Sequence, residues 1–221
     1  MDYIAHIRSD FPTKFGIPRQ SGLVSSLRAE IVFEEKYRDP AALRGIEGFS
    51  HLWLLWEFSE AKREHWSPTV RPPRLGGNER IGVFASRSPF RPNPIGLSCV
   101  RLEEVRLEDM VLVVSGADLM DGTPIFDIKP YLPYADAHPE AIGGFAHSAP
   151  EALLTVDCPG VLLEKIPESH KDALFGVLAQ DPRPSYQDDP DRVYGMAFAG
   201  FDVRFTVSGN HLTVKQILSH Q

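Results

Sequence analysis

A chain of 221 residues that is 43% hydrophobic can bury one good core, or form one domain with a small appendage. Its formal net charge of −7 argues against a protein that coats nucleic acid by bulk electrostatics. The first residues do not resemble a signal peptide and no apolar run has the length of a membrane helix, so we expect a cytoplasmic protein without a membrane segment. Its two cysteines, Cys99 and Cys158, make neither a disulfide framework nor a metal-ligand spacing.

The first part of the chain alternates short apolar runs with turn residues, and its 19 prolines and 17 glycines favour a loop-rich, mainly β protein. No long helix separates the runs, which excludes parallel βαβ units and predicts a closed or nearly closed antiparallel β-barrel over residues 1–145. The predicted strands are Tyr3–Ile7, Ala29–Phe33, Phe49–Phe58, Ile81–Ala85, Leu97–Leu107, Met110–Val114 and Thr123–Ile128. The nearly continuous run FSHLWLLWEF predicts a strand buried on both faces, with His51 as a hydrogen-bonded core histidine.

After Gly143 and Gly144 the pattern changes. The run ALLTVDC predicts a strand, and Glu168–Leu178 predicts a helix with one apolar face. The runs VYGMAFA, FDVRFTV and HLTVKQIL predict a meander whose last turn contains Gly209. We therefore expect a small C-terminal α+β domain over residues 146–221, of a size that needs a neighbour to stay folded.

The segment Arg87–Leu97, RSPFRPNPIGL, is a stiff basic loop between two β-like runs. Its prolines restrict the backbone, which lowers the entropic cost of presenting Arg87 and Arg91 to a carboxylate or phosphate. The stretch from Trp66 to Arg101 has six arginines and one acid, a local basic stripe that suits a specific anionic partner. A rigid barrel corner with solvated arginines is the alternative.

Three further segments carry polar groups in constrained loops. PRQSGLV contains Arg19 and Gln20, and composition alone favours a solvated turn over a ligand-gripping loop there. DLMDGTPIFDIKPYLPYAD contains the turn Asp121–Pro124, flanked by carboxylates and Lys129 that a plain turn does not require. DPRPSY places an aromatic residue beside an arginine, which suits a base or a phosphate. Phosphate-binding loops, Rossmann glycine motifs, nucleophile elbows and metal-ligand spacings are all absent from the sequence.

Several long motifs, taken together and in order, closely resemble those of the TsaA-like family, also called YaeB-like or TrmO. In chain order they are PTVRPPRLGG, RSPFRPNPIGLS, DLMDGTPIFDIKPYLPYAD and AQDPRPSY. The similarity extends over nearly the whole chain, including GLVSS and GFSHLWLLWEF. The resemblance implies an S-adenosylmethionine-dependent enzyme that methylates N6 of threonylcarbamoyladenosine beside the anticodon of tRNA. It also implies a barrel unlike the Rossmann-type methyltransferases, and a homodimer with the cofactor close to the subunit interface.

The resemblance also implies site residues. Transferred position by position, the cofactor pocket comprises Arg19, Gln20, Ser21, Phe58, Ser59, Arg87, Leu97, Asp118, Leu119, Asp121, Gly122 and Thr123. The acceptor nitrogen has a poor lone pair, so we expect Asp127 or Tyr186 to take its proton or orient the amide, with Arg183 reaching the reaction site. Arg91, Lys129 and Arg183 are the predicted substrate-binding residues, meeting anticodon-loop phosphates or the threonyl carboxylate.

Two other functions remain open from the residues. The same cofactor could serve a small-molecule acceptor or a different RNA, which the acidic overall charge mildly favours. A non-catalytic barrel that senses an adenosyl ligand is the third possibility, and it would bind S-adenosylmethionine and release it unchanged. Acceptor identity and cofactor turnover distinguish these three functions.

Overall fold

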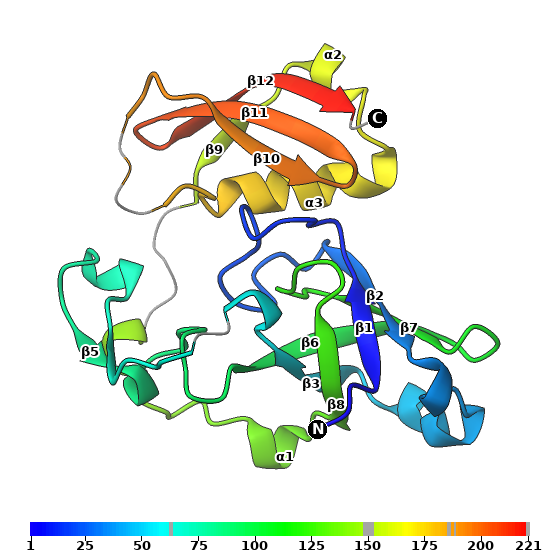
Figure 1. Ribbon diagram of the computed structural model, residues 1–221. Coiled ribbons are helices and arrows are strands. Elements are labelled where there is room, and N and C mark those ends of the chain that lie inside the picture. The colour runs from blue at the N-terminus through cyan, green and yellow to red at the C-terminus, as the bar shows by residue number, and fades with distance from the viewer. Residues whose placement is uncertain (62–63, 148–152, 185–186, 188, 220–221) are drawn as a thin grey trace.

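The computed structural model describes residues 1–61, 64–147, 153–184, 187 and 189–219. Figure 1 shows two β layers, a barrel and a second sheet with a helix between them. The barrel is closed in the strand order β1-β2-β7-β6-β3-β8, and every neighbouring pair is antiparallel. Its strands are β1 (Ala5–Arg8), β2 (Arg28–Phe33), β3 (His51–Glu57), β6 (Ile95–Arg106), β7 (Val111–Ser115) and β8 (Pro124–Pro130). The prediction of a mainly β, antiparallel barrel is confirmed.

Strand β3 corrects one prediction about burial. Leu52, Leu54 and Trp56 point into the barrel and are buried. Residues between them, such as Trp53 and Leu55, are only partly buried on the outer face. His51 lies on that outer face beside Ser50, at 2.9 Å between Nδ1 and the hydroxyl oxygen, so it is not a core histidine. The prediction of two buried faces was wrong because an aromatic run has no polar residues to mark its outer face.

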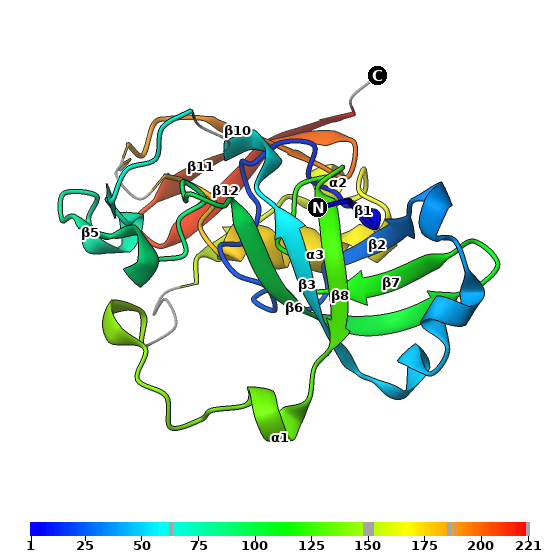
Figure 2. The same ribbon diagram turned by 60° about the horizontal axis from the view of Figure 1, so that its bottom comes forward.

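A short arm projects from the barrel on the side away from β2 and β7, as Figures 1 and 2 show. It contains the two-stranded sheet of β4 (Thr69–Val70) and β5 (Ile81–Gly82). The predicted strand Ile81–Ala85 is therefore too long, because its last three residues form a 3-10 turn, η6 (Val83–Ala85). The other 3-10 turns are η1 (Glu35–Tyr37), η2 (Pro40–Leu43), η3 (Ile46–Gly48), η4 (Ser59–Ala61), η5 (Pro73–Leu75) and η7 (Gly144–Ala146), and the one-turn helix α1 (Pro133–Asp136) follows β8.

The C-terminal layer is a four-stranded sheet in the order β10-β11-β12-β9. It comprises β9 (Thr155–Asp157), α2 (Gly160–Leu163), α3 (Glu168–Ala179), β10 (Tyr194–Phe198), β11 (Phe201–Ser208) and β12 (His211–Ser219). The predicted helix and meander are confirmed, and Gly209 and its neighbour turn the chain between paired residues Ser208 and His211. Strand β9 pairs in parallel with β12, which the sequence did not indicate.

The hydrophobic core of this layer is completed by the loop between β1 and β2. Phe11, Val24 and Leu27 of that loop are at most 4% exposed and belong to the same core cluster as α3 and the C-terminal strands. The loop therefore lies between the barrel and α3 (Figure 1). It supplies the neighbour that so small a unit requires.

Gly176 on α3 tests this contact. A Cβ at Gly176 would lie 2.6 Å from Cγ1 of Val24, closer than real carbon atoms approach. Gly176→Ala gains about 1 kcal/mol of helix propensity and loses about 1–3 kcal/mol to overpacking, so we expect net destabilisation in urea unfolding. Gly160→Ala, where a Cβ would meet nothing within 4 Å, is the control. A Gly176→Ala protein as stable as that control would contradict close packing of the loop on α3.

Candidate active site

A polar cluster that extends from the buried Ser98 to the exposed Arg87 lies where the β1–β2 loop meets strand β6. We call it the Asp118 cluster and define it as Gln20, Ser21, Arg87, Ser98 and Asp118. The Ser98 hydroxyl donates to Oδ1 of Asp118 at 2.5 Å and accepts from the indole Nε1 of Trp56 at 2.9 Å. Burial raises the pKa of Asp118, while hydrogen bonds and the nearby Arg87 guanidinium act in the opposite direction. A carboxylate so enclosed is an acceptor ready for a polar or cationic ligand.

The β1–β2 loop takes the place of a strand at this end of β6. Strand β7 pairs with β6 from Arg101 onwards, so the earlier part of β6 has an open backbone edge. The Ser21 hydroxyl accepts a hydrogen bond from the Cys99 amide at 3.2 Å, and the Gly22 amide donates to the Gly116 carbonyl at 2.8 Å. The backbone amide of Ser21 also stabilises the charged Asp118, lowering the pKa of that carboxyl against the effect of burial.

The proline-rich loop closes the cluster through Arg87. Its guanidinium Nη1 donates to the side-chain oxygen of Gln20, whose Nε2 in turn donates to the Arg19 carbonyl at 2.5 Å. The fold thus brings together three separate segments of the sequence that were predicted to bind the cofactor. They carry Arg19, Gln20 and Ser21, then Arg87, and then Asp118.

Phe58, Ser59 and Leu97 have different surroundings. The Phe58 ring lies 4.3 Å from the Trp56 ring, and its amide donates to the Pro94 carbonyl at 2.8 Å, so it adjoins the cluster through Trp56. Ser59 begins η4 directly after it. Leu97 points outward from β6 with 58% of its surface exposed, on the opposite face from Ser98.

The rest of the predicted Asp118–Thr123 segment mainly braces the barrel. Leu119 and Thr123 are buried, and the Thr123 hydroxyl donates to the Met120 carbonyl at 2.7 Å. Asp121 accepts from the Ser9 amide at 3.0 Å. Gly122 has φ of +74°, a left-handed conformation that favours glycine. Side chains of this turn are thus engaged with the barrel and the start of the β1–β2 loop.

Asp127 and Lys129 lie on the outer face of the barrel, away from the enclosed side of the Asp118 cluster. Asp127 and Leu97 flank Leu55 from the two neighbouring strands, so the three side chains share one row. The carboxylate of Asp127 accepts from the Ile128 amide at 2.9 Å and pairs with the Lys129 ammonium at 2.8 Å. Both candidates are therefore exposed to an incoming substrate.

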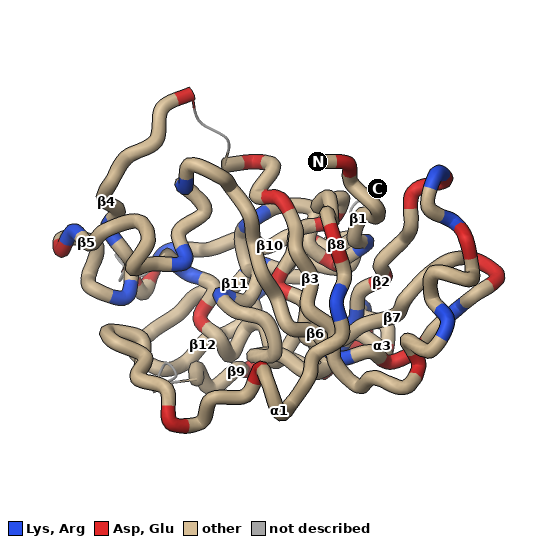
Figure 3. Tube along the Cα trace, turned by 90° about the horizontal axis from the view of Figure 1, so that it is seen from below, with Lys and Arg blue, Asp and Glu red and all other residues tan. Residues whose placement is uncertain are grey.

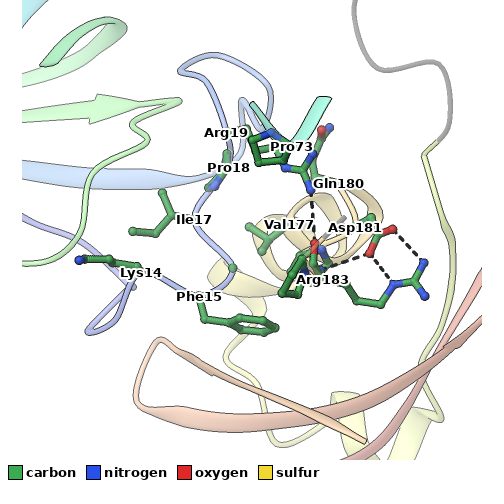
Figure 4. A pocket seen from close by; sticks show the side chains of 13 residues that line it. Lys14, Phe15, Ile17, Pro18, Arg19, Pro73, Val177, Gln180, Asp181 and Arg183 are labelled. Atoms are coloured by element: carbon green, nitrogen blue, oxygen red, sulfur yellow. Dashed lines mark hydrogen bonds and ion pairs between the residues drawn. The ribbon is translucent and has the colours of Figure 1, made fainter. Parts of the chain in front are cut away.

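Arg183 follows α3 and contacts the β1–β2 loop. Its carbonyl accepts from Nη2 of Arg19 at 3.3 Å, and its guanidinium pairs with both oxygens of Asp181 at 2.9 and 3.0 Å. These residues border a cavity of about 270 Å³ between the loop and the end of α3, shown in Figure 4. Its walls include Phe15, Ile17 and Val177. Tyr186 lies outside the described residues.

Arg91 is engaged with its own loop. Its Nη1 donates to the Ser86 carbonyl at 2.7 Å and to the Val83 carbonyl at 3.4 Å. Two backbone carbonyls, one at the start of η6 and one just after its end, thus occupy Nη1 of Arg91. An anion would have to be bound by the other nitrogens of this guanidinium.

Sequence reasoning missed Ser98 and Trp56. Both side chains point inward from their strands. The sequence could have indicated Ser98, because a polar residue at an inward strand position needs a hydrogen-bond partner. The described residues contain no group of three or more histidine, cysteine or acidic side chains able to hold a metal ion. Within the same part of the chain, no helix has the length and apolar character to cross a membrane.

Fold and site together define a class: a closed antiparallel β-barrel with a candidate polar ligand site where its β1–β2 loop, proline-rich loop and β6 meet. Residues 6–137 match the family model of the tRNA-methyltransferase O N-terminal domain, and residues 162–220 match that of the TrmO C-terminal domain. The chain belongs to the TrmO family.

Similar proteins agree over most of the chain. The tRNA (adenine(37)-N6)-methyltransferase of Escherichia coli (strain K12) is 45% identical over 217 residues, covering 94% of this chain and 92% of that protein. A Pseudomonas aeruginosa relative that carries the name S-adenosylmethionine-dependent methyltransferase RcsF is 42% identical over 217 residues, covering 91% and 90%. The crystal structure of TrmO from Pseudomonas aeruginosa matches with a TM-score of 0.82 and 33% identity, covering 99% of this chain and 97% of that one.

Proposed function

We propose that this chain transfers a methyl group from S-adenosylmethionine to N6 of adenosine 37 in tRNA, on adenosine that already carries the threonylcarbamoyl group. The match to tRNA (adenine(37)-N6)-methyltransferases over nearly the whole chain supports the reaction. The single structural observation that supports a cofactor site is the Asp118 cluster, in which a largely enclosed carboxylate lies within electrostatic reach of the Arg87 guanidinium.

The residues of the Asp118 cluster fit S-adenosylmethionine chemically. Asp118 provides an acceptor for hydroxyl or ammonium groups, and Arg87, with Arg19 beside the cluster, provides a guanidinium group for a carboxylate. When bound, the cofactor supplies an electrophilic methyl group on its sulfonium. Phe58 and Ser59 adjoin the Asp118 cluster through Trp56. The Asp118–Thr123 turn would contribute backbone groups to the cofactor, because the side chains of Leu119 and Thr123 are buried. Binding that holds the acceptor in line and excludes water supplies most of the catalysis.

The acceptor side of the reaction is assigned to groups outside the Asp118 cluster. Asp127 takes the proton of the acceptor nitrogen or orients its amide, and Tyr186 is the alternative for the same role. Lys129, Arg91 and Arg183 bind phosphates or the threonyl carboxylate. Partial exposure of Asp127 and Lys129 supports access by a macromolecular substrate.

The functional unit we propose is a cytoplasmic homodimer. The outer face of β6 and β3 supports the homodimer, because it presents Leu97 at 58% exposure and Ile95 at 38% exposure beside the half-buried Leu55. A second copy covering this face would bury apolar surface next to Asp127.

The reaction is tested by incubating the protein with S-adenosylmethionine and tRNA that carries threonylcarbamoyladenosine, followed by mass analysis of nucleosides. A gain of one methyl on that nucleoside is the expected result. Cofactor binding without methyl transfer would instead support a non-catalytic barrel that senses an adenosyl ligand. Methylation of another acceptor alone would show that the enzyme acts on a different class of substrate.

Asp127→Asn is expected to lower the single-turnover rate with bound tRNA by about 100-fold, because it removes a positioned proton acceptor. Cofactor affinity should stay unchanged, since Asp127 is on the outer face. Asp172→Asn, at an exposed position of α3, is the charge-matched control. A near-normal rate for Asp127→Asn would assign the role of proton acceptor to Tyr186. Near-normal rates for both Asp127→Asn and Tyr186→Phe would show that neither residue is the proton acceptor.

A further inference from the structure

Two large aromatic rings stand exposed on the arm. Trp66 is 52% exposed and Phe84 is 73% exposed, and their ring centroids are 6.2 Å apart with planes inclined at 32°. Neither residue belongs to the hydrophobic core clusters of the described chain. We call this pair the Trp66–Phe84 platform. Because the two rings pack on each other, they form one contiguous exposed apolar patch, a feature that indicates an interaction site.

Hydrogen bonds and strand pairing fix the backbone on both sides of the platform. Phe84 lies in η6, whose Val83 is 1% exposed and donates its amide to the Pro68 carbonyl at 2.9 Å. The register of β4 with β5 pairs Thr69 with Gly82, which brings the segment after Trp66 against the segment before Phe84. Arg91 fixes the other end of the turn through its bonds to the Ser86 and Val83 carbonyls. An ordered platform binds with a smaller entropic cost than a mobile one.

Positive charge surrounds the platform. Residues 66–94 contain five arginines and one acid, Glu79, in a chain whose formal net charge is −7. Figure 3 shows basic segments along β4 and β5. Arg80 is positioned by a hydrogen bond of 3.1 Å from Nη1 to the Thr69 hydroxyl oxygen, and Arg71 is exposed. Aromatic rings interleaved with arginines suit nucleic acid, because bases stack on the rings and phosphates pair with the guanidinium groups.

We propose that the Trp66–Phe84 platform is an RNA-binding surface, on which an unpaired base next to the target nucleotide stacks while the arginines of the arm contact the phosphate backbone. The inference rests on the tRNA substrate of the proposed function and names the surface that holds it. Arg87 connects the two sites, since it follows Phe84 in the same loop and bonds to Gln20 of the Asp118 cluster. A base held on the platform would position its neighbour toward the cofactor site.

The test is the binding of a fluorescently labelled anticodon stem-loop RNA, measured by anisotropy without cofactor. Phe84→Leu should weaken binding about tenfold, because it removes a stacking face while keeping an apolar side chain. Phe84→Tyr should bind like the wild type. Tyr134→Leu, which removes a ring that is 88% exposed on α1, is the matched control and should leave binding unchanged.

Two further readouts address the mechanism. The RNA should quench tryptophan fluorescence of the wild type, and Trp66→Phe should lose most of that quenching while retaining affinity. Arg71→Gln should weaken binding to all sequences alike and reduce the slope of log K against log salt by about 0.7–0.9.

Each outcome separates this inference from the proposed function. Unchanged RNA affinity in Phe84→Leu, with methyl transfer at wild-type KM, would overturn the platform and leave the methyltransferase intact. If Phe84→Leu lost self-association in sedimentation and kept its RNA affinity, the RNA-binding surface would be overturned in favour of an interface between copies of this chain. Platform-dependent RNA binding by a wild-type protein that transfers no methyl group would support the inference and overturn the proposed function.

Discussion

Replacing Asp118 by asparagine is expected to weaken S-adenosylmethionine binding by about 10- to 100-fold, measured by isothermal titration calorimetry. The substitution preserves the shape of the side chain, so the Ser98 hydroxyl, at 2.5 Å, can still donate to an oxygen there. It removes the negative charge, and hydrogen bonds to charged groups contribute about 1.5–3 kcal/mol. The loss should therefore appear in affinity with little change in the free energy of unfolding.

Asp109→Asn is the matched control for Asp118. Asp109 is exposed in the turn between β6 and β7, and its substitution makes the same change of charge. If both variants bound the cofactor with wild-type affinity, the Asp118 cluster would be a structural feature of the barrel and the cofactor site would lie elsewhere.

The pH dependence gives an independent readout of the same carboxylate. Burial raises the pKa of Asp118 above the ordinary value of 3.8, so it takes up a proton at a higher pH than an exposed aspartate. Cofactor affinity of the wild type should fall as the pH decreases through that range, and Asp118→Asn should remove this dependence. The contribution to stability has the opposite sign: a folded-state pKa above the unfolded one makes the free energy of unfolding rise as the pH falls.

The barrel was predictable because short apolar runs, separated by turn residues, mark its strands in the local sequence. Strand β7 follows β6 after a tight acidic turn, and proline and glycine punctuate the other connections. The faces of β3 were not predictable from its aromatic run, because residues such as Trp53 and Leu55 are apolar and yet lie on the outer surface. Three-dimensional pairing with β6 and β8 decides which side is enclosed.

The candidate site was predictable as a set of segments and much less as a set of contacts. Proline-rich and turn motifs pointed to the loops of Arg87 and Asp118, whereas composition favoured a solvated turn at Arg19 and only the resemblance placed that loop in the site. The contacts of Ser98 depend on the register between β3 and β6, which no local pattern contains. For the same reason, nothing in the loop sequence indicated that Arg91 bonds to carbonyls of its own loop.

Gly96→Ala is expected to destabilise the barrel by about 3 kcal/mol and to abolish most cofactor binding. Gly96 is buried in β6 opposite Trp56, and a Cβ there would lie 2.5 Å from Cδ2 of the indole and closer still to Cε2 and Cζ2. A glycine inside a strand is suited to such a close approach. Displacing the indole would break its bond to Ser98, and with it the support of Asp118. Chemical denaturation and cofactor titration measure the two effects.

The control for Gly96 is Gly48→Ala in η3, where a Cβ would meet nothing within 4 Å, and it should be near wild type in both measurements. A double-mutant cycle with Trp56→Leu isolates the cause, because Gly96→Ala should cost much less once the indole is gone. If Gly96→Ala were equally destabilising in both backgrounds, the cost would come from the strand itself. If it left stability and cofactor affinity intact, Trp56 would not be the link between the barrel core and Asp118.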